Sequence, residues 1–218
     1  MNFEPDFSST TLPTMKNNTT PTKIAVFLDR DGTLNIDTSY PASLDDIELL
    51  PGAIEAVRLL NEAGILAIVV TNQSGVARGY FSEERVLEIN AGITRWFEEG
   101  CARIDGWYYC PHHPTAGEAP YRKECDCRKP GGGMLLQAAK DFDLDLSRCY
   151  MIGDKLSDVE AGLRLKMTTV LVNTGEGKLQ AVKAAADKTL PQPDHVLADV
   201  LAAAKYIVEN ASSLPPAK

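Results

Sequence analysis

Residues 24–33 read Ile-Ala-Val-Phe-Leu-Asp-Arg-Asp-Gly-Thr, and this stretch decides the fold of the 218-residue chain. Its first five residues form a continuous apolar run, which is typical of a strand buried on both faces. Asp29 and Asp31 follow this run directly, and Gly32 allows the chain to turn sharply after them. Because residues two apart in extended chain point the same way, both carboxylates can face one ligand while Arg30 points elsewhere. Two carboxylates so close repel each other unless a cation joins them, and their hard oxygen ligands favour Mg²⁺.

Strand and helix patterns alternate along the rest of the chain. Short apolar runs predict further strands at 65–70, 107–110, 150–152 and 169–172. Helical spacing predicts helices over about 51–63, 82–99, 134–142 and 157–165, with more helix towards the C-terminus. This order predicts an α/β, Rossmann-like three-layer sandwich with a mainly parallel sheet and no insertion long enough for a large cap domain. In such a sheet the ligand lies beyond the carboxyl ends of the strands.

Length and composition limit the classes of protein to consider. A single globular domain is expected over residues 22–212, and residues 1–21, rich in Ser, Thr, Asn and Pro, are expected to be a disordered extension. The net charge of −8 disfavours a nucleic-acid partner. No apolar run reaches the roughly 20 residues needed to cross a bilayer, and we expect no membrane partner. With five cysteines and no export signal, a cytoplasmic protein with reduced thiols is expected. We also expect a monomer.

Polar residues follow the other predicted strands as well. The segment Thr71-Asn72-Gln73-Ser74 comes after the second strand, where a hydroxyl and free backbone N–H groups can bind phosphoryl oxygens. After the fourth strand, Asp154 can complete a metal site, and Asp158, one helical turn on, can support it from the same face. Arg128 and Lys129 place two cations just before a helix. Turn chemistry, helix capping or an exposed basic loop would each account for one of these features alone; together they indicate phosphoryl transfer.

The loop at about 110–127 carries a second cluster of candidate ligands. Two short pairs supply three thiolates and an imidazole, which is the ligand set of a closed tetrahedral zinc site: Cys110, His112, Cys125 and Cys127. A structural Zn²⁺ would order a long loop that has little regular pattern. His113 is adjacent and could replace His112. The remaining cysteines, Cys101 and Cys149, fall on helix and strand patterns and are expected to be buried.

Taken together, the strand-end motifs resemble those of the haloacid dehalogenase-like (HAD) phosphatase superfamily, over about residues 24–172. The motifs occur in order as Asp29-x-Asp31, Thr71, Lys129 and Gly153-Asp154 to Asp158. The resemblance implies that Asp29 attacks phosphorus to form an aspartyl-phosphate, while Asp31 acts first as acid and then as base. It also implies that Mg²⁺ is held by Asp29, the Asp31 carbonyl and Asp154, with Asp158 in support. Thr71 and Lys129 would hold the phosphoryl oxygens.

The zinc loop is similar to that of two groups of enzymes within the superfamily. One group removes the C7 phosphate of D-glycero-D-manno-heptose 1,7-bisphosphate in the ADP-heptose route to lipopolysaccharide, and the other hydrolyses histidinol phosphate. The segments Thr71–Gly79, Cys110–Pro114 and Cys125–Pro130 are similar to the first group, and Lys155 stands where the second usually has Arg. This resemblance implies that a small sugar bisphosphate, of either anomer, is the partner. The residues implied to bind it are Asp37, Tyr40, Thr71, Asn72, Gln73, Ser74, Arg128, Lys129 and Lys155.

Two other functions remain open at this point. A histidinol-phosphate or broad sugar-phosphate phosphatase would use the same motifs. A zinc-stapled binding module that has lost catalysis would show a replaced nucleophile or metal acid, whereas Asp29, Asp31 and Asp154 are all present.

Overall fold

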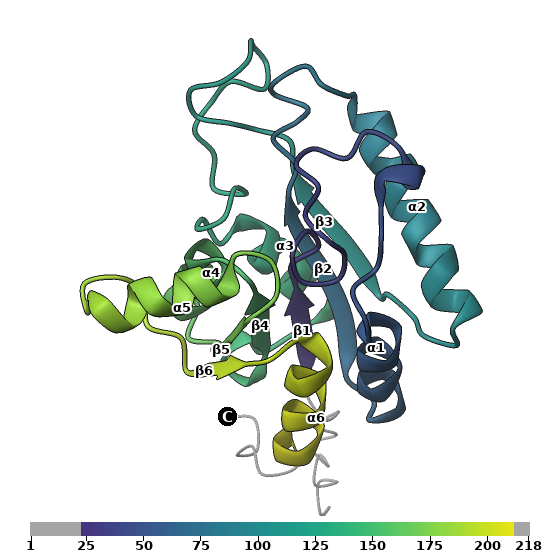
Figure 1. The fold of residues 1–218 in the computed structure, drawn as a ribbon, viewed down its shortest axis with the longest axis vertical. Helices are drawn as coiled ribbons and strands as arrows, with labels where there is room; N and C mark the ends of the chain where they lie inside the picture. Colours follow the sequence, from purple (N-terminus) through teal and green to yellow (C-terminus); the bar gives the residue numbers. More distant parts are fainter. Residues whose placement is uncertain (1–22, 212–218) are drawn as a thin grey trace, which may run out of the picture.

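Six parallel strands form one sheet in the order β3-β2-β1-β4-β5-β6 (Figure 1). The computed structural model describes residues 23–211, so the predicted extension at 1–21 lies outside the described residues. The strands are β1 (Ala25–Leu28), β2 (Leu66–Asn72), β3 (Gly106–Cys110), β4 (Tyr150–Gly153), β5 (Thr168–Val172) and β6 (His195–Leu197). The helices are α1 (Ala53–Glu62), α2 (Glu83–Glu99), α3 (Gly133–Phe142), α4 (Leu156–Arg164), α5 (Gly177–Ala186) and α6 (Val200–Ala211), with short 3₁₀ turns at Leu44–Asp46 and Leu146–Arg148.

The apolar run in β1 is buried on both faces, as its sequence predicts. Val26 and Leu28 pack into one core with α1, α2 and α6, and Ala25 and Phe27 pack into a second core with α3 and α4. Alternation of side chains along an extended strand therefore divides one short run between two layers of helix. The three-layer α/β sandwich is confirmed, and all five strand pairings are parallel.

Two elements differ from the sequence prediction. β2 continues through Thr71 and Asn72, because these residues pair with Tyr109 and Cys110 of β3, so they end the strand rather than follow it. β6, which pairs with β5, was not predicted because three residues give too short a pattern to detect.

β1 lies at the centre of the sheet, where the chain order reverses between β2 on one side and β4 on the other. Such a reversal leaves a crevice beyond the carboxyl ends of the strands, where ligands bind in open α/β sheets. The two long connections, residues 29–52 and 111–132, extend beyond this same end of the sheet (Figure 1). Among the described residues, no helix is long and apolar enough to cross a membrane.

Candidate active site

Asp29 lies at the carboxyl end of β1, in the crevice between β1 and β4. Its backbone N–H donates to the Ile152 carbonyl at 2.9 Å, which fixes it to the neighbouring strand. The residue is only 5% exposed. Burial raises the pKa of its carboxyl to about 6, against the opposing effect of the Lys129 charge. Asp29 is therefore a largely desolvated carboxylate at the floor of the crevice.

Lys129 reaches this floor from the loop before α3. Its Nζ lies 2.6 Å from Asp29 Oδ1 and 2.7 Å from Asp158 Oδ1, and it donates to the Val70 carbonyl at 2.8 Å. Burial alone would lower the pKa of Lys129, but the carboxylates of Asp158 and Asp29 outweigh it and raise that pKa. Lys129 is thus a buried, charged ammonium held by three oxygen atoms.

Asp154 completes a cluster of acids whose geometry fits a divalent cation. One oxygen each from Asp29, Asp154 and Asp158 lies within 4.8 Å of the others. The Oδ2 atom of Asp154 accepts the Glu176 backbone N–H, whereas its Oδ1 is buried without a hydrogen-bond partner. Burial and, to a smaller extent, the nearby negative charge of Asp29 raise the pKa of Asp154 to about 7. An unpartnered buried carboxylate oxygen beside a second carboxylate is the environment that Mg²⁺ stabilises.

Two glycines let the backbone approach Asp154 closely. A Cβ at Gly32, which has a φ of +91°, would lie 2.4 Å from Asp154 Oδ2, and a Cβ at Gly175 would lie 2.2 Å from the same atom. Any side chain at either position would displace the carboxylate. The glycine of the opening motif is therefore required for close approach to Asp154 as well as for the turn.

Asp158 belongs to this cluster, but its direct contacts are not with Asp154. Its Oδ1 pairs with Lys129, and its Oδ2 accepts the Lys155 backbone N–H at 3.1 Å, at the start of α4. The side chain therefore caps α4 and also contacts Lys129. Its support of a metal site stays a prediction.

Arg30 corrects the expectation that it points away from the two acids. Its side chain is fully buried and holds Asp31, with Nε 3.1 Å from Oδ1 and Nη2 3.0 Å from Oδ2. The chain has left the extended conformation here, because the N–H groups of Thr33, Leu34 and Asn35 all donate to the Arg30 carbonyl. Side chains alternate between the two sides only in extended chain, so the alternation cannot be used to place Arg30 and Asp31.

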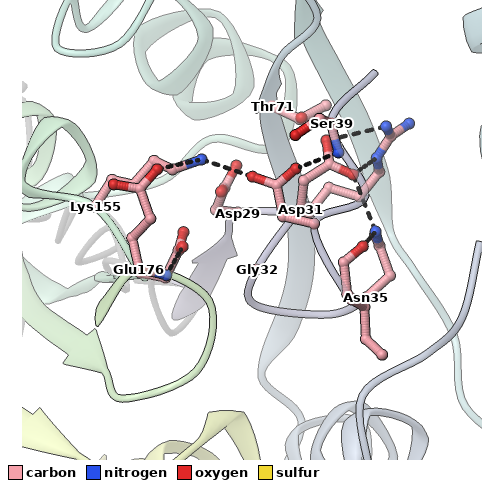
Figure 2. Close-up of polar contacts among 12 residues, drawn as sticks. Asp29, Asp31, Gly32, Asn35, Ser39, Thr71, Lys155 and Glu176 are labelled. Atoms are coloured by element: carbon pink, nitrogen blue, oxygen red, sulfur yellow. Dashed lines mark hydrogen bonds and ion pairs between the residues drawn. The ribbon is translucent and has the colours of Figure 1, made fainter. Parts of the chain in front are cut away.

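The residues predicted to bind substrate all line one cavity of about 390 Å³. They are Asp37, Tyr40, Thr71, Asn72, Gln73, Ser74, Arg128, Lys129 and Lys155, together with Asp29, Asp31 and Asp158. Figure 2 shows Asp29 and Asp31 with Thr71 on one side and Lys155 and Glu176 on the other. These residues share one cavity, and the role of each in binding a substrate stays a prediction.

Within the cavity wall, the polar residues at the end of β2 have different contacts. The Thr71 hydroxyl accepts from Gln73 Nε2 at 2.8 Å, which leaves its own proton available to a ligand oxygen. The Asn72 amide instead pairs with the Lys129 backbone, accepting its N–H and donating to its carbonyl, both at 3.0 Å. Asn72 therefore holds the lysine segment in place with both of its side-chain polar atoms.

Lys155 is paired with two acids at the cavity wall. Its Nζ lies 3.0 Å from Asp37 Oδ2 and 3.7 Å from Glu176 Oε1. Burial would raise the pKa of Asp37, but the hydrogen bond and charge of Lys155 lower it. Glu176 was not predicted, because an acid shortly after β5 carries no motif, although its strand-end position was a usable signal.

Tyr40 covers one side of the cavity and is held by an aromatic and a cationic neighbour. Its ring packs edge-on against Tyr80, with ring centroids 5.0 Å apart, and the Arg78 guanidinium lies 5.6 Å from the Tyr40 ring centre. Ser39 and Tyr40 both have positive φ angles, 60° and 64°, in a segment that lines the cavity. This segment corresponds to the one predicted to lie over the substrate.

The four predicted zinc ligands converge in the loop beyond β3. The Cys110, Cys125 and Cys127 sulfurs lie 3.0–3.5 Å apart, and His112 Nδ1 lies 3.7 Å from the Cys110 sulfur and 3.3 Å from the Cys127 sulfur. A tetrahedron with Zn–S bonds of about 2.3 Å has edges of about 3.8 Å, so these atoms are close to a zinc geometry. Burial raises the pKa of the Cys110 thiol, and a bound cation would offset this effect by stabilising the thiolate.

The structure selects His112 over His113 as the candidate ligand. Both ring nitrogens of His113 have other neighbours: Nδ1 accepts the Thr115 and Ala116 backbone N–H groups, and Nε2 lies 3.2 Å from Arg78 Nη2. Of the other cysteines, Cys149 is buried as expected. Cys101 is exposed, contrary to prediction, because it lies just past the end of α2 with a φ of 58° rather than on the packed face of the helix.

Comparisons of the sequence and of the structure with known proteins agree on one family. A family model described as HAD-hyrolase-like matches residues 126–203. A D-glycero-beta-D-manno-heptose-1,7-bisphosphate 7-phosphatase from Photorhabdus laumondii is 49% identical over 157 residues, covering 70% of this chain and 81% of its own. The protein of that name from Escherichia coli K12 is 43% identical over 171 residues, covering 76% and 87%. The structure of D,D-heptose 1.7-bisphosphate phosphatase from B. bronchiseptica, complexed with magnesium and phosphate, has a TM-score of 0.75 and 31% identity, covering 86% of this chain and 99% of that one.

Proposed function

We propose, because this chain belongs to the family of D-glycero-beta-D-manno-heptose-1,7-bisphosphate 7-phosphatases, that it hydrolyses the C7 phosphate of this sugar bisphosphate. The products are the heptose 1-phosphate and inorganic phosphate, in the ADP-heptose route to lipopolysaccharide. The observation that carries the proposal is one cavity with Asp29 and Lys129 at its floor and two more cations, Arg128 and Lys155, in its wall. Lys155 is paired with Asp37 and Glu176 there, and a phosphate would compete with these acids for its ammonium. A substrate with two phosphates needs more positive charge than the transferred group alone.

In the first step Asp29 supplies the nucleophile. An Asp29 carboxylate oxygen forms a bond to the phosphorus of the C7 phosphate while the bond from phosphorus to the sugar oxygen breaks. The leaving oxygen takes a proton from the protonated form of Asp31, so the sugar departs as an alcohol. Lys129, 2.6 Å from Asp29, and the free proton of the Thr71 hydroxyl stabilise the charge on the phosphoryl oxygens.

In the second step the aspartyl-phosphate is hydrolysed. Asp31, now a carboxylate, accepts a proton from a water molecule as that water attacks phosphorus. The bond from phosphorus to the Asp29 oxygen breaks, which releases inorganic phosphate and restores Asp29. Asp31 ends the cycle protonated, so the two proton transfers balance.

Two metals fit the residues present. Asp29, Asp154 and the Asp31 carbonyl would hold Mg²⁺, which when bound neutralises the repulsion between an anionic nucleophile and an anionic phosphate. The buried, unpartnered Asp154 Oδ1 supports this assignment. Cys110, His112, Cys125 and Cys127 would hold a structural Zn²⁺ that orders the loop carrying Arg128. Arg128 donates to the His112 carbonyl at 3.2 Å, so the order of the loop is transmitted to the cavity wall.

The test is a substrate panel with Mg²⁺ and zinc-loaded protein. It compares the β and α anomers of heptose 1,7-bisphosphate with histidinol phosphate and sugar monophosphates. We expect the highest kcat/KM for the β anomer, following the family. A clear preference for histidinol phosphate would overturn the proposal, and equal rates with all sugar monophosphates would replace it with a broad phosphatase.

A further inference from the structure

The carboxylate of Asp31 accepts four hydrogen bonds, all from side-chain nitrogen atoms. Oδ1 accepts from Arg30 Nε at 3.1 Å and from Asn35 Nδ2 at 3.0 Å. Oδ2 accepts from Arg30 Nη2 at 3.0 Å and from Gln73 Nε2 at 2.8 Å. In Figure 2 Asn35 reaches Asp31 from the side opposite Thr71. Both oxygens of the ionised side chain are therefore held. The protonated form can give up the Gln73 contact of Oδ2 on the cavity side, while the two contacts from Arg30 still fix the rotation of the side chain.

Arg30 is the centre of this arrangement and does not itself reach the cavity. It is 0% exposed and is not among the residues that line the cavity of Asp29 and Asp31. Its third donor, Nη1, lies 3.1 Å from Asn90 Oδ1, a buried acceptor in α2. The planar guanidinium thus spans from a helix in the outer layer to both oxygens of Asp31, which a lysine ammonium cannot do.

Asn90 has a single assignable role in this network. It is 4% exposed, and its Nδ2 is buried without a hydrogen-bond partner. Leaving a buried donor unpaired costs free energy. Among the described residues, the one hydrogen bond that the Asn90 side chain makes is the bond that its Oδ1 accepts from Arg30 Nη1, and this bond sets the plane of the guanidinium.

We propose that Arg30, anchored by Asn90, is a positioning residue that sets the orientation in which Asp31 transfers protons. The inference rests on the proposed function, in which Asp31 protonates the leaving sugar oxygen. Proton transfer requires hydrogen-bond reach and alignment between the two heavy atoms, so a rotated carboxylate transfers its proton slowly even when it is present. Arg30 touches neither substrate nor phosphorus and acts only through Asp31.

The inference predicts a dependence on the leaving group. A sugar alcohol is a poor leaving group that needs a proton as it departs, whereas p-nitrophenolate is stable without one. Loss of positioning should therefore slow phosphoryl transfer from a sugar phosphate and leave transfer from p-nitrophenyl phosphate nearly unchanged. A merely structural role would slow both substrates equally.

The experiment compares Arg30→Lys, which keeps the charge but loses the fork, with Asn90→Leu, which removes only the anchor. Arg85→Lys, in an exposed ion pair with Glu88 on the same helix, is the matched control. Pre-steady-state quenched flow measures the first step with heptose bisphosphate and with p-nitrophenyl phosphate. General acid catalysis contributes about 10²–10⁴-fold, so we expect Arg30→Lys to slow the sugar reaction by at least about tenfold, and Asn90→Leu by a smaller factor. In Arg30→Lys and Asn90→Leu, the burst rate with p-nitrophenyl phosphate and the KM for heptose bisphosphate should change less than about twofold. Arg85→Lys should match the wild type with both substrates.

Equal slowing of both substrates, or a raised KM with unchanged kcat, would overturn the positioning role. Asn90→Leu decides the question if Arg30→Lys fails to fold, because Asn90 contributes no charge. If the wild type rejects heptose bisphosphate but hydrolyses another sugar phosphate, only the proposed substrate fails, and the same comparison is made with that sugar phosphate. A wild type that hydrolyses no phosphate ester would overturn both.

Discussion

Replacing Lys129 with methionine tests how the site holds its charges together. The Nζ of Lys129 lies 2.6 Å from Asp29, 2.7 Å from Asp158 and 2.8 Å from the Val70 carbonyl, and the residue is 3% exposed. Methionine fills a similar volume without the charge, so two buried carboxylates lose their cation. Removing one partner of a buried ion pair destabilises a protein by about 3–5 kcal/mol. We expect a loss of this size in the free energy of unfolding.

Lys155→Met is the matched control. Its ammonium also faces two acids, at 3.0 and 3.7 Å, but its side chain is 32% exposed. Solvent screens such a pair, and its removal should change stability by about 0–1 kcal/mol. Because both lysines face two acids, a difference in stability loss between the two variants reports the effect of burial rather than the number of charges lost.

The assay is urea unfolding at pH 7.5 without added Mg²⁺, with equal zinc loading of every variant. The loss of unfolding free energy in Lys129→Met, relative to the wild type, should grow between pH 6 and pH 8. The pKa of Asp29 is already raised to about 6 and rises further without the lysine, so the folded variant holds a proton that the unfolded chain has released, and stability falls as pH rises. Adding Asp158→Asn should recover about 0.5–3 kcal/mol, the usual range for coupled neighbours. A Lys129→Met loss no larger than that of Lys155→Met would refute the reasoning.

Three other changes test the site. Asp29→Asn should abolish turnover, by at least about 10³-fold, with circular dichroism unchanged, because an amide cannot act as the nucleophile; near-normal kcat would contradict the assignment. The increase in Tm on adding Mg²⁺ should grow from pH 5 to pH 8, since the pKa values of Asp29 and Asp154 are raised to about 6 and about 7 and protons compete with the metal below these values; a shift independent of pH would count against the site. Cys125→Ser should lower zinc from about one per chain and reduce Tm, while His113→Ala should retain the zinc; metal analysis showing the reverse would exchange the two histidines.

The candidate site was accessible from the sequence because its parts are local motifs at strand ends. Parallel strands deliver their carboxyl ends to one edge, so Asp29, Thr71 and Asp154 could be grouped without knowing any distance. The candidate zinc ligands were accessible for a similar reason, since two short pairs of Cys and His in one loop are typical of a metal site. Glu176 was missed because it belongs to no recognisable motif. Arg30 was expected to point away from the acids because the alternation of an extended strand was assumed to continue past Asp29.

The sequence by itself determined the chemistry available and the burial of β1 on both faces. Periodicity is a local property, so the two-faced burial of β1 follows from five residues. Tertiary structure decided which charges neutralise one another. Lys129 and Asp29 are 100 positions apart and meet at 2.6 Å, while Arg30 turns back onto the adjacent Asp31 because three N–H groups close a turn on its carbonyl. Such pairings depend on burial, which strengthens a contact between charges and penalises an unpaired one, and burial exists only once the layers have packed.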